Sequence, residues 1–285
     1  MSIQRITVIG TGTMGNGIAG QGAISGFDVT LFDIDSKRVE VALKQIEQTY
    51  EKGLKRQKVS EESVVAARKR LSPQSDLARA VENADLIVEA VPENMALKKK
   101  LFASFEAHGK AGVILASNTS SLSITEIASA TEHPENVAGM HFFNPVAVMP
   151  LVELVRGEYT STESMTQVRN VAEQMGKSCI EVNDSPGFAT SRLGIALGNE
   201  AMRMFEEGVA SAEDIDKAMA LGYRHPIGPL ALTDLVGLDV RLAISEHLYR
   251  EIGTDTFRPP RVLRRMVRAG KLGRKSGRGF YTYDD

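Results

Sequence analysis

The chain has 285 residues, 42% of them hydrophobic and 25% charged, and its formal net charge at pH 7 is −2. These values fit an ordinary globular protein with two domains, and they exclude the strongly basic surface of a nucleic-acid binder. One cysteine excludes an internal disulfide. Because we find neither a secretion signal nor an apolar run of about 20 residues, we expect a cytoplasmic protein with no membrane partner.

Strand-like and helix-like segments alternate over the first two-thirds of the chain. Short β-branched runs at 6–10 and 28–33 flank a helix of small residues that Gly26 ends. An amphipathic helix follows from Ser36, and a second helical stretch covers 60–71. Further strands are predicted at 84–91, 112–118, 136–143 and 151–155. Such alternation predicts a mainly parallel sheet with helices on both faces.

The pattern changes after residue 184. Beyond it β-branched runs almost disappear, and helix formers dominate the stretches 192–208, 211–222, 239–253 and 260–270. We therefore predict an α/β domain over residues 1–184 and a smaller all-α domain over 185–285.

The first predicted strand runs directly into a glycine-rich turn. Gly10, Gly12 and Gly15 form the pattern G-x-G-x-x-G between this strand and the following helix. In that context the pattern is typical of a Rossmann-type dinucleotide-binding domain, although a turn packed for steric reasons is the alternative. The helix N-terminus would offer N–H groups to a pyrophosphate. The predicted cofactor-binding residues of this loop are Gly10, Gly12, Thr13, Met14 and Gly15.

An acidic residue, Asp33, ends the next predicted strand. Its carboxylate would accept hydrogen bonds from a ribose 2′-hydroxyl and would repel a 2′-phosphate, which favours NAD over NADP. Lys37 and Arg38 lie close by in the sequence and could serve a phosphate, so a strict preference does not follow. FAD uses the same fingerprint, but a single fingerprint favours a nicotinamide cofactor.

His141 is one of five histidines and lies at the end of an apolar run, twelve positions before Glu153. Oxidation of a secondary alcohol needs a group that takes the hydroxyl proton, and a neutral imidazole oriented by a carboxylate suits this task. Two strands joined by a short loop could bring the two side chains together. From these residues alone, a catalytic pair and a structural histidine both stay open.

Five stretches occur in an order that resembles the 3-hydroxyacyl-CoA dehydrogenase family. They are "ASNTSSLSIT" (116–125), "GMHFFNPVAVMPLVELVRG" (139–157), "NDSPGF" (183–188), "HPIGPLALTDLVGLD" (225–239) and "GRKSGRGFY" (273–281). The similarity covers essentially the whole chain. It implies reversible, NAD-dependent oxidation of a (3S)-3-hydroxyacyl-CoA, such as 3-hydroxybutyryl-CoA, to the 3-oxoacyl-CoA.

The resemblance also implies roles for individual residues. His141 is expected to be the general base in oxidation and the acid in reduction, with Glu153 as its partner and Ser120 bonded to the 3-oxygen of the substrate. The residues expected along the cofactor are Glu93, Lys98, Asn118 and Asn144. No metal is expected.

The chain departs from the family at one position. The family usually carries an asparagine after "PGF-x-x", where this chain has Ser191. Ser191 could contact the substrate through a shorter side chain, or merely cap the helix that opens the second domain. Thr190 or Asn199 could contribute instead.

A basic stretch on the long helix after Asp33 could bind coenzyme A. By the resemblance, Thr49 and Arg56 are placed to contact it, whereas the alternative is an ordinary solvated helix face. The family also implies a homodimer formed through the helical domain. Two rival functions stay open: a hydroxy-acid or sugar-acid dehydrogenase of the L-gulonate type that uses no CoA, and a dinucleotide-binding protein without activity.

Overall fold

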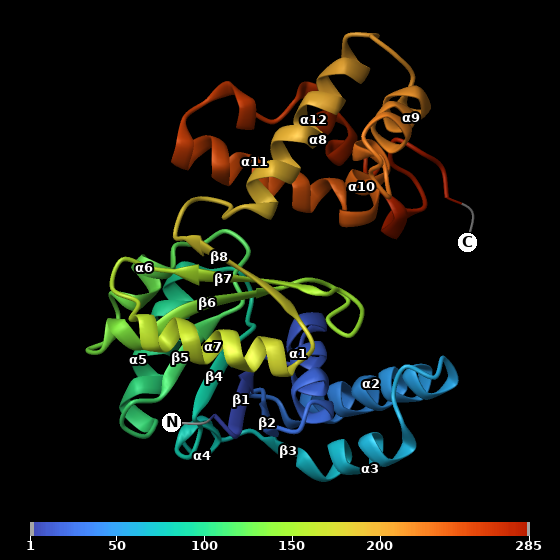
Figure 1. Cartoon of the computed structure of the whole chain (residues 1–285). Coiled ribbons are helices and arrows are strands. Elements are labelled where there is room, and N and C mark those ends of the chain that lie inside the picture. The colour runs from blue at the N-terminus through green and yellow to red at the C-terminus, as the bar shows by residue number, and fades with distance from the viewer. Residues whose placement is uncertain (1–2, 284–285) are drawn as a thin grey trace. The chain divides into compact units, whose positions relative to one another are not determined.

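The computed structural model describes residues 3–283, and the chain forms two compact units, Met1–Ser185 and Pro186–Asp285 (Figure 1). The predicted domain boundary lay one residue earlier, after residue 184. Each unit contains hydrophobic core clusters of its own.

Unit 1, residues 1–185, is built on one eight-stranded sheet in the order β3-β2-β1-β4-β5-β6-β7-β8. Neighbouring strands are parallel except β6 and β7, which run antiparallel. The mainly parallel sheet predicted from the sequence is thus confirmed. The strands are β1 (Arg5–Ile9), β2 (Asp28–Phe32), β3 (Leu71–Gln74), β4 (Leu86–Glu89), β5 (Ile114–Ser117), β6 (Val137–Phe142), β7 (Leu151–Arg156) and β8 (Ser178–Asn183).

Helices cover both faces of this sheet. Alternate strand residues such as Val8, Leu31 and Met140 belong to one core cluster with α1, α2, α3 and α7, and α7 crosses the front of the sheet in Figure 1. The strand residues that alternate with these point to the opposite face of the sheet. On that face, a Cβ atom added to Gly139 would lie 3.1 Å from Ile124 of α6. The helices of unit 1 are α1 (Thr13–Ile24), α2 (Ser36–Lys55), α3 (Glu61–Arg70), α4 (Leu77–Val81), α5 (Met95–His108), α6 (Ile124–Ala128) and α7 (Thr162–Gln174).

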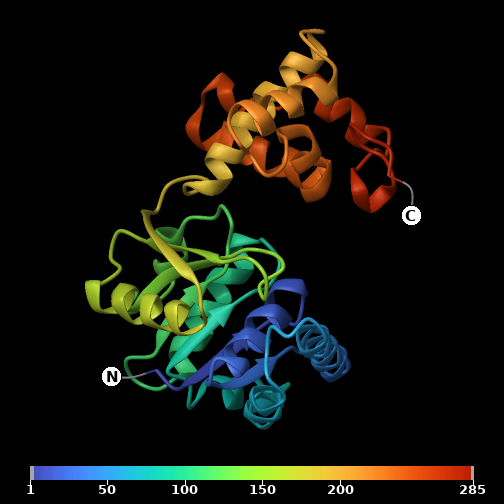
Figure 2. The ribbon, with the colours of Figure 1, turned by 45° about the vertical axis from the view of Figure 1, so that its right-hand side comes forward.

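The long helix α2 forms where the apolar spacing predicted it. Asp35 caps its N-terminus by accepting a hydrogen bond from the backbone N–H of Lys37. Val39 and Tyr50 lie on its buried face, and the Tyr50 hydroxyl donates to the carbonyl oxygen of Gly20 in α1 at 2.8 Å. This contact holds α2 alongside α1, as Figure 2 shows.

Several elements were not predicted from the sequence, among them β3 and α10. Strand β3 contains Pro73, which has no N–H group to donate to a neighbouring strand and therefore argues against a strand. Because β3 lies at the edge of the sheet, it tolerates this proline. Helix α10 begins at Pro229, directly after a loop that reads as rigid, because proline is well suited to the first turn of a helix.

Unit 2, residues 186–285, is helical, as predicted. No helix in the described part of the chain is long and apolar enough to cross a membrane. The helices are α8 (Thr190–Glu206), α9 (Ala212–Gly222), α10 (Pro229–Val236), α11 (Leu238–Ile252) and α12 (Arg261–Arg268).

Buried Asp234 holds the C-terminal segment of unit 2 in place. Its carboxylate accepts hydrogen bonds from the backbone N–H groups of Phe280 and Tyr281, each at 3.0 Å, and from the Tyr283 hydroxyl at 2.9 Å. A Cβ on Gly279 would lie 2.0 Å from the same carboxylate. The glycine in "RGFY" is therefore needed for close packing.

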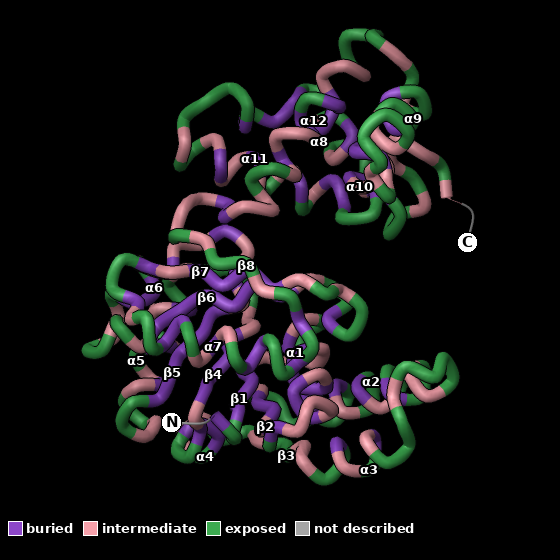
Figure 3. Tube along the Cα trace, viewed as in Figure 1, coloured by how far each residue is buried: buried purple, intermediate pink, exposed green. Residues whose placement is uncertain are grey.

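Buried residues are concentrated in the strands of unit 1 (Figure 3), and one buried ion pair stands among them. Glu89, at the end of β4, accepts hydrogen bonds from Lys98 Nζ at 2.7 and 2.8 Å and from Ser117 Oγ at 2.7 Å. The Lys98 and Glu89 side chains are 1% and 0% exposed. The pair ties α5 to the sheet, and removing one partner would leave an uncompensated buried charge.

We expect Lys98→Met and Glu89→Gln each to lower the free energy of unfolding by about 3–5 kcal/mol. The double variant should recover most of this loss because no charge is then left unpaired. Urea denaturation measures the effect, with Lys99→Met on the same helix as the control. If Lys98→Met were as stable as the wild type but bound NADH more weakly, Lys98 would contribute only to cofactor binding.

Candidate functional site

The predicted site residues of unit 1 follow the carboxyl ends of neighbouring parallel strands. Ile9 of β1 is in register with Glu89 of β4, Glu89 with Ser117 of β5, and Ser117 with Gly139 of β6. The loops after these strands therefore meet along one edge of the sheet. In open α/β sheets ligands bind at this edge, where the strand order reverses beside β1.

The antiparallel register of β6 and β7 brings the candidate acid–base pair together. His141 and Glu153 are direct partners across the two strands, and their side chains therefore lie on the same face of the sheet. His141 Nδ1 is 2.7 Å from Glu153 Oε2, and the side chains are 9% and 0% exposed. An ionised Glu153 can only accept, so in a neutral imidazole Nδ1 carries the proton and Nε2 is the basic nitrogen.

Further contacts fix the surroundings of His141. Asn118, which follows β5, accepts a hydrogen bond from the backbone N–H of Phe142 at 2.9 Å. The Phe143 ring lies 4.5 Å from the imidazole, centroid to centroid. Asn144, the next residue, is exposed and opens the loop between β6 and β7.

The glycine loop has the shape that the motif predicts. Gly10 has a φ of +102°, and a Cβ there would lie 2.7 Å from the carbonyl oxygen of Ala90. A Cβ on Gly15 would lie 1.8 Å from the carbonyl oxygen of Gly10, whereas a Cβ on Gly12 would meet nothing within 4 Å. The backbone at Gly12 therefore faces open space, into which the N-terminus of α1 directs its N–H groups.

The remaining residues of this loop complete a cradle for a dinucleotide. Thr13 is exposed, and Met14 packs against the core of unit 1. Asp33, after β2, accepts a hydrogen bond from the Thr11 hydroxyl at 2.7 Å. The half-buried carboxylate is thus held at the position expected for a ribose contact, and the donor set fits NAD.

Ser120 and Glu93 lie together beside the carboxyl edge. Glu93 Oε1 accepts hydrogen bonds from Thr119 Oγ1 at 2.5 Å and from the backbone N–H of Ser120 at 3.1 Å. Lys98 Nζ lies 3.3 Å from Glu93 Oε2 but is directed mainly to Glu89. The exposed Glu93, not the buried Lys98 ammonium, is the member of this group that solvent reaches.

The candidate substrate residues lie in both units. Thr49 is exposed on α2, and Arg56, seven positions later, is the exposed C-cap residue of this helix. Ser191 is the second residue of α8, whose N-cap is Ala189, so Ser191 does not cap this helix. Asn199 is buried and donates to Ser245 and to the carbonyl oxygen of Thr256, which gives it a structural role.

Lys177 is a polar residue near this site that the sequence does not indicate. Its buried Nζ donates to the carbonyl oxygens of Val146 and Met149, in the loop between β6 and β7. Desolvation by burial lowers the pKa of this ammonium. In the sequence this lysine stands between Gly176 and the first residue of β8, and nothing in that pattern predicts a contact with the loop.

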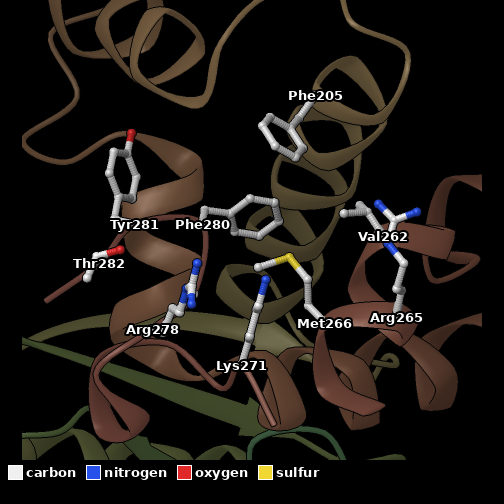
Figure 4. A pocket seen from close by; sticks show the side chains of 10 residues that line it. Phe205, Val262, Arg265, Met266, Lys271, Arg278, Phe280, Tyr281 and Thr282 are labelled. Atoms are coloured by element: carbon white, nitrogen blue, oxygen red, sulfur yellow. The ribbon is translucent and has the colours of Figure 1, made fainter. Parts of the chain in front are cut away.

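A separate pocket of about 290 Å³ lies within unit 2 (Figure 4). Phe205 and Phe280 form its apolar wall, and Arg265, Lys271 and Arg278 bring positive charge to it. It contains none of the predicted site residues. Among residues 3–283, no group of histidine, cysteine and carboxylate side chains is arranged to hold a metal ion.

Comparisons with known proteins assign both units to one family. Residues 5–185 match the NAD binding domain of 3-hydroxyacyl-CoA dehydrogenase, and residues 187–283 match its C-terminal domain. A probable 3-hydroxybutyryl-CoA dehydrogenase of Bacillus subtilis is 46% identical over 100% of this chain and 99% of its own length.

Solved structures agree with this assignment. The (S)-3-hydroxybutyryl-CoA dehydrogenase of Ralstonia eutropha is 42% identical to this chain in sequence and superimposes on it with a TM-score of 0.95. The alignment covers 100% of each of the two chains. A diketoreductase that acts on dicarbonyl compounds is 31% identical with a TM-score of 0.87, covering 99% of this chain and 100% of its own. The two matched domains agree with the glycine cradle and with the pairing of histidine and glutamate. The chain therefore belongs to the 3-hydroxyacyl-CoA dehydrogenase family of NAD-dependent oxidoreductases.

Proposed function

We propose that this enzyme interconverts (3S)-3-hydroxyacyl-CoA and 3-oxoacyl-CoA, with short acyl chains such as 3-hydroxybutyryl-CoA as substrates. The observation that carries the proposal is the contact between His141 and Glu153 at the carboxyl edge, on the sheet that also carries the glycine cradle. The relatives named 3-hydroxybutyryl-CoA dehydrogenase, which match along nearly their whole length, support this substrate class.

His141 moves the proton. As C3 of the substrate becomes a carbonyl, the 3-hydroxyl proton passes to Nε2 of His141, and the buried Glu153 stabilises the imidazolium that forms. In the reverse direction the imidazolium returns this proton to the 3-oxygen. Bound NAD supplies the hydride acceptor for oxidation and, once reduced, the hydride donor.

Other side chains orient the reacting groups. Ser120 donates a hydrogen bond to the 3-oxygen, while Asn144 holds the nicotinamide end and Asn118 fixes the strand that carries His141. Glu93 lies along the cofactor. The buried pairing of Lys98 supports a positioning role for this residue, behind Glu93.

The coenzyme A portion of the substrate is bound by α2. Thr49 is exposed on this helix and Arg56 at its C-cap, where the guanidinium can pair with a phosphate. Ser191 contacts the acyl group from the first turn of α8, with a hydroxyl in place of the amide that is usual in the family.

The active form is a homodimer assembled through unit 2. Three large apolar side chains at the junction of α10 and α11 are exposed, namely Leu235, Val236 and Val240. Their burial between two copies would remove this apolar surface from water. A cytoplasmic location stays a prediction.

A specific observation favours a second candidate substrate class. The diketoreductase relative acts on dicarbonyl compounds, which raises reduction of a free 3-oxo acid as an alternative to that of a thioester. The exposed Arg56 at the C-cap of α2 favours the thioester, because a small free acid has no phosphate for it.

The direct test follows NADH oxidation at 340 nm with acetoacetyl-CoA, with parallel assays using free acetoacetate and using NADPH. We expect turnover with the thioester and NADH and little in the other two assays. The His141→Ala variant is the control, since general acid–base catalysis contributes about 100-fold or more to such rates. Equal rates for acetoacetate would favour the diketoreductase type, and no rate above His141→Ala would mean a protein without turnover.

Asp33 determines the choice of cofactor in this proposal. We expect Asp33→Ala to weaken NADH binding by about 10-fold while leaving NADPH binding unchanged or improved, because the ribose contact is lost and a charge that repels the 2′-phosphate is removed. Fluorescence titration with both nucleotides measures the two affinities. Glu40→Ala, at an exposed position of α2, is the control. A parallel loss for both nucleotides would remove the ribose assignment.

A further inference from the structure

The loop between β6 and β7 has little packing of its own. Among residues 143–150, all of which the structure describes, only Val146 is buried. Its side chain packs on α1, where a Cβ on Gly17 would lie 2.9 Å from it. Two backbone N–H groups within the loop donate to the carbonyl oxygen of Pro145, so these bonds close a turn without attaching it to the rest of unit 1. The position of the loop therefore depends on few contacts.

Lys177 is the side chain that attaches this loop to the turn before β8. It is 8% exposed, and its Nζ donates to the carbonyl oxygens of Val146 and Met149, the latter at 3.0 Å. Desolvation is the one cause of the lowered pKa of this ammonium, so no carboxylate of the described residues offsets its charge. An apolar side chain would fill the same space without the cost of burying a charge. The ammonium is therefore explained by the two carbonyl oxygens that it holds.

This loop joins the surroundings of the glycine cradle to those of His141. Gly17, on which Val146 packs, follows Thr13 at the start of α1 by four residues, a rise of about 6 Å. Asn144, the second residue of the loop, follows His141 by three positions. In the proposed function the cofactor has its pyrophosphate at the cradle and its reactive ring near His141, because the hydride and the proton leave the same C3–OH group. The loop thus flanks the nicotinamide half of the cofactor.

We infer that Lys177 is a positioning residue, which holds the loop, and with it Asn144, in the conformation that binds the nicotinamide ring. The inference rests on the proposed function, in which Asn144 holds the nicotinamide end. Lys177 acts through the loop backbone, to which its ammonium is directed. Without this ammonium, the carbonyl oxygen of Val146 would lose a buried hydrogen bond, and the loop would shift to let water reach it. A shift of about 1 Å is enough to misplace a reacting ring.

The test compares NADH with ADP-ribose, which has the adenosine, the pyrophosphate and the second ribose but no nicotinamide ring. Isothermal titration calorimetry measures the Kd of both ligands for the wild type and for Lys177→Met. We expect Lys177→Met to weaken NADH binding about 10-fold and to leave ADP-ribose binding within about 2-fold of the wild type, because only the ring meets the loop. Its kcat with acetoacetyl-CoA should fall by about 10-fold or more.

Matched variants separate this role from a general effect on folding. Gln21→Met is the control, because the Gln21 amide donates to the carbonyl oxygen of Met175, in the same turn before β8, and not to the loop. It should leave both Kd values unchanged. Lys177→Arg keeps a charged donor and should lose less NADH affinity than Lys177→Met. If Lys177→Met does not fold, Lys177→Gln, which keeps an uncharged donor, is measured in its place, and the same selective loss of NADH affinity is expected.

The binding measurements do not depend on turnover, so failure of this inference is distinguishable from failure of the proposed function. Equal losses of NADH and ADP-ribose affinity, or an unchanged Kd for NADH, would overturn the inference alone. Absence of acetoacetyl-CoA reduction by the wild type would overturn the proposed function. In that case the two Kd values still decide whether Lys177 acts on the nicotinamide end.

Discussion

The pairing of β6 with β7 is the constraint on which the candidate active site depends. It is the one antiparallel pairing in the described sheet, and its register places His141 opposite Glu153. Because side chains alternate along a strand, a slip of one residue would move one partner to the other face of the sheet. The 2.7 Å contact between imidazole and carboxylate is thus a product of strand register, and loop conformation alone could not maintain it.

The loop that joins these strands is held by contacts with Lys177 and with helix α1. Lys177, just before β8, donates to two of its carbonyl oxygens, and Val146 packs so closely on α1 that a Cβ on Gly17 would lie 2.9 Å from it. Helix α1 also opens at the glycine cradle, so one element supports both the cofactor loop and the loop that carries Asn144. The contacts within unit 1 link the glycine cradle and the pair of His141 and Glu153 through shared packing, since close-packed interiors leave little freedom to move.

Turns and strand ends could be predicted from the local sequence, whereas the direction in which individual side chains point could not. The turn at Gly10 and the acidic residue after β2 follow from short-range spacing, whereas the spacing of His141 and Glu153 left open whether their strands pair. The sequence did not indicate that Lys98 turns inward to Glu89, because the register of α5 against the sheet decides it. Arg241 of α11 likewise is only 6% exposed, and a Cβ on Gly194 or Gly198 of α8 would lie 3.5 or 3.6 Å from its Nη1, which no local sequence pattern indicates.

In the proposed mechanism Glu153 acts on catalysis through His141 and not on cofactor binding. The kcat with acetoacetyl-CoA and the Kd for NADH in the Glu153→Gln variant distinguish these two effects. We expect kcat to fall by about 100-fold or more, because the imidazolium loses its stabilising charge, while the Kd for NADH changes little. An equal loss of NADH affinity would contradict it and would make the pair a structural element of the fold.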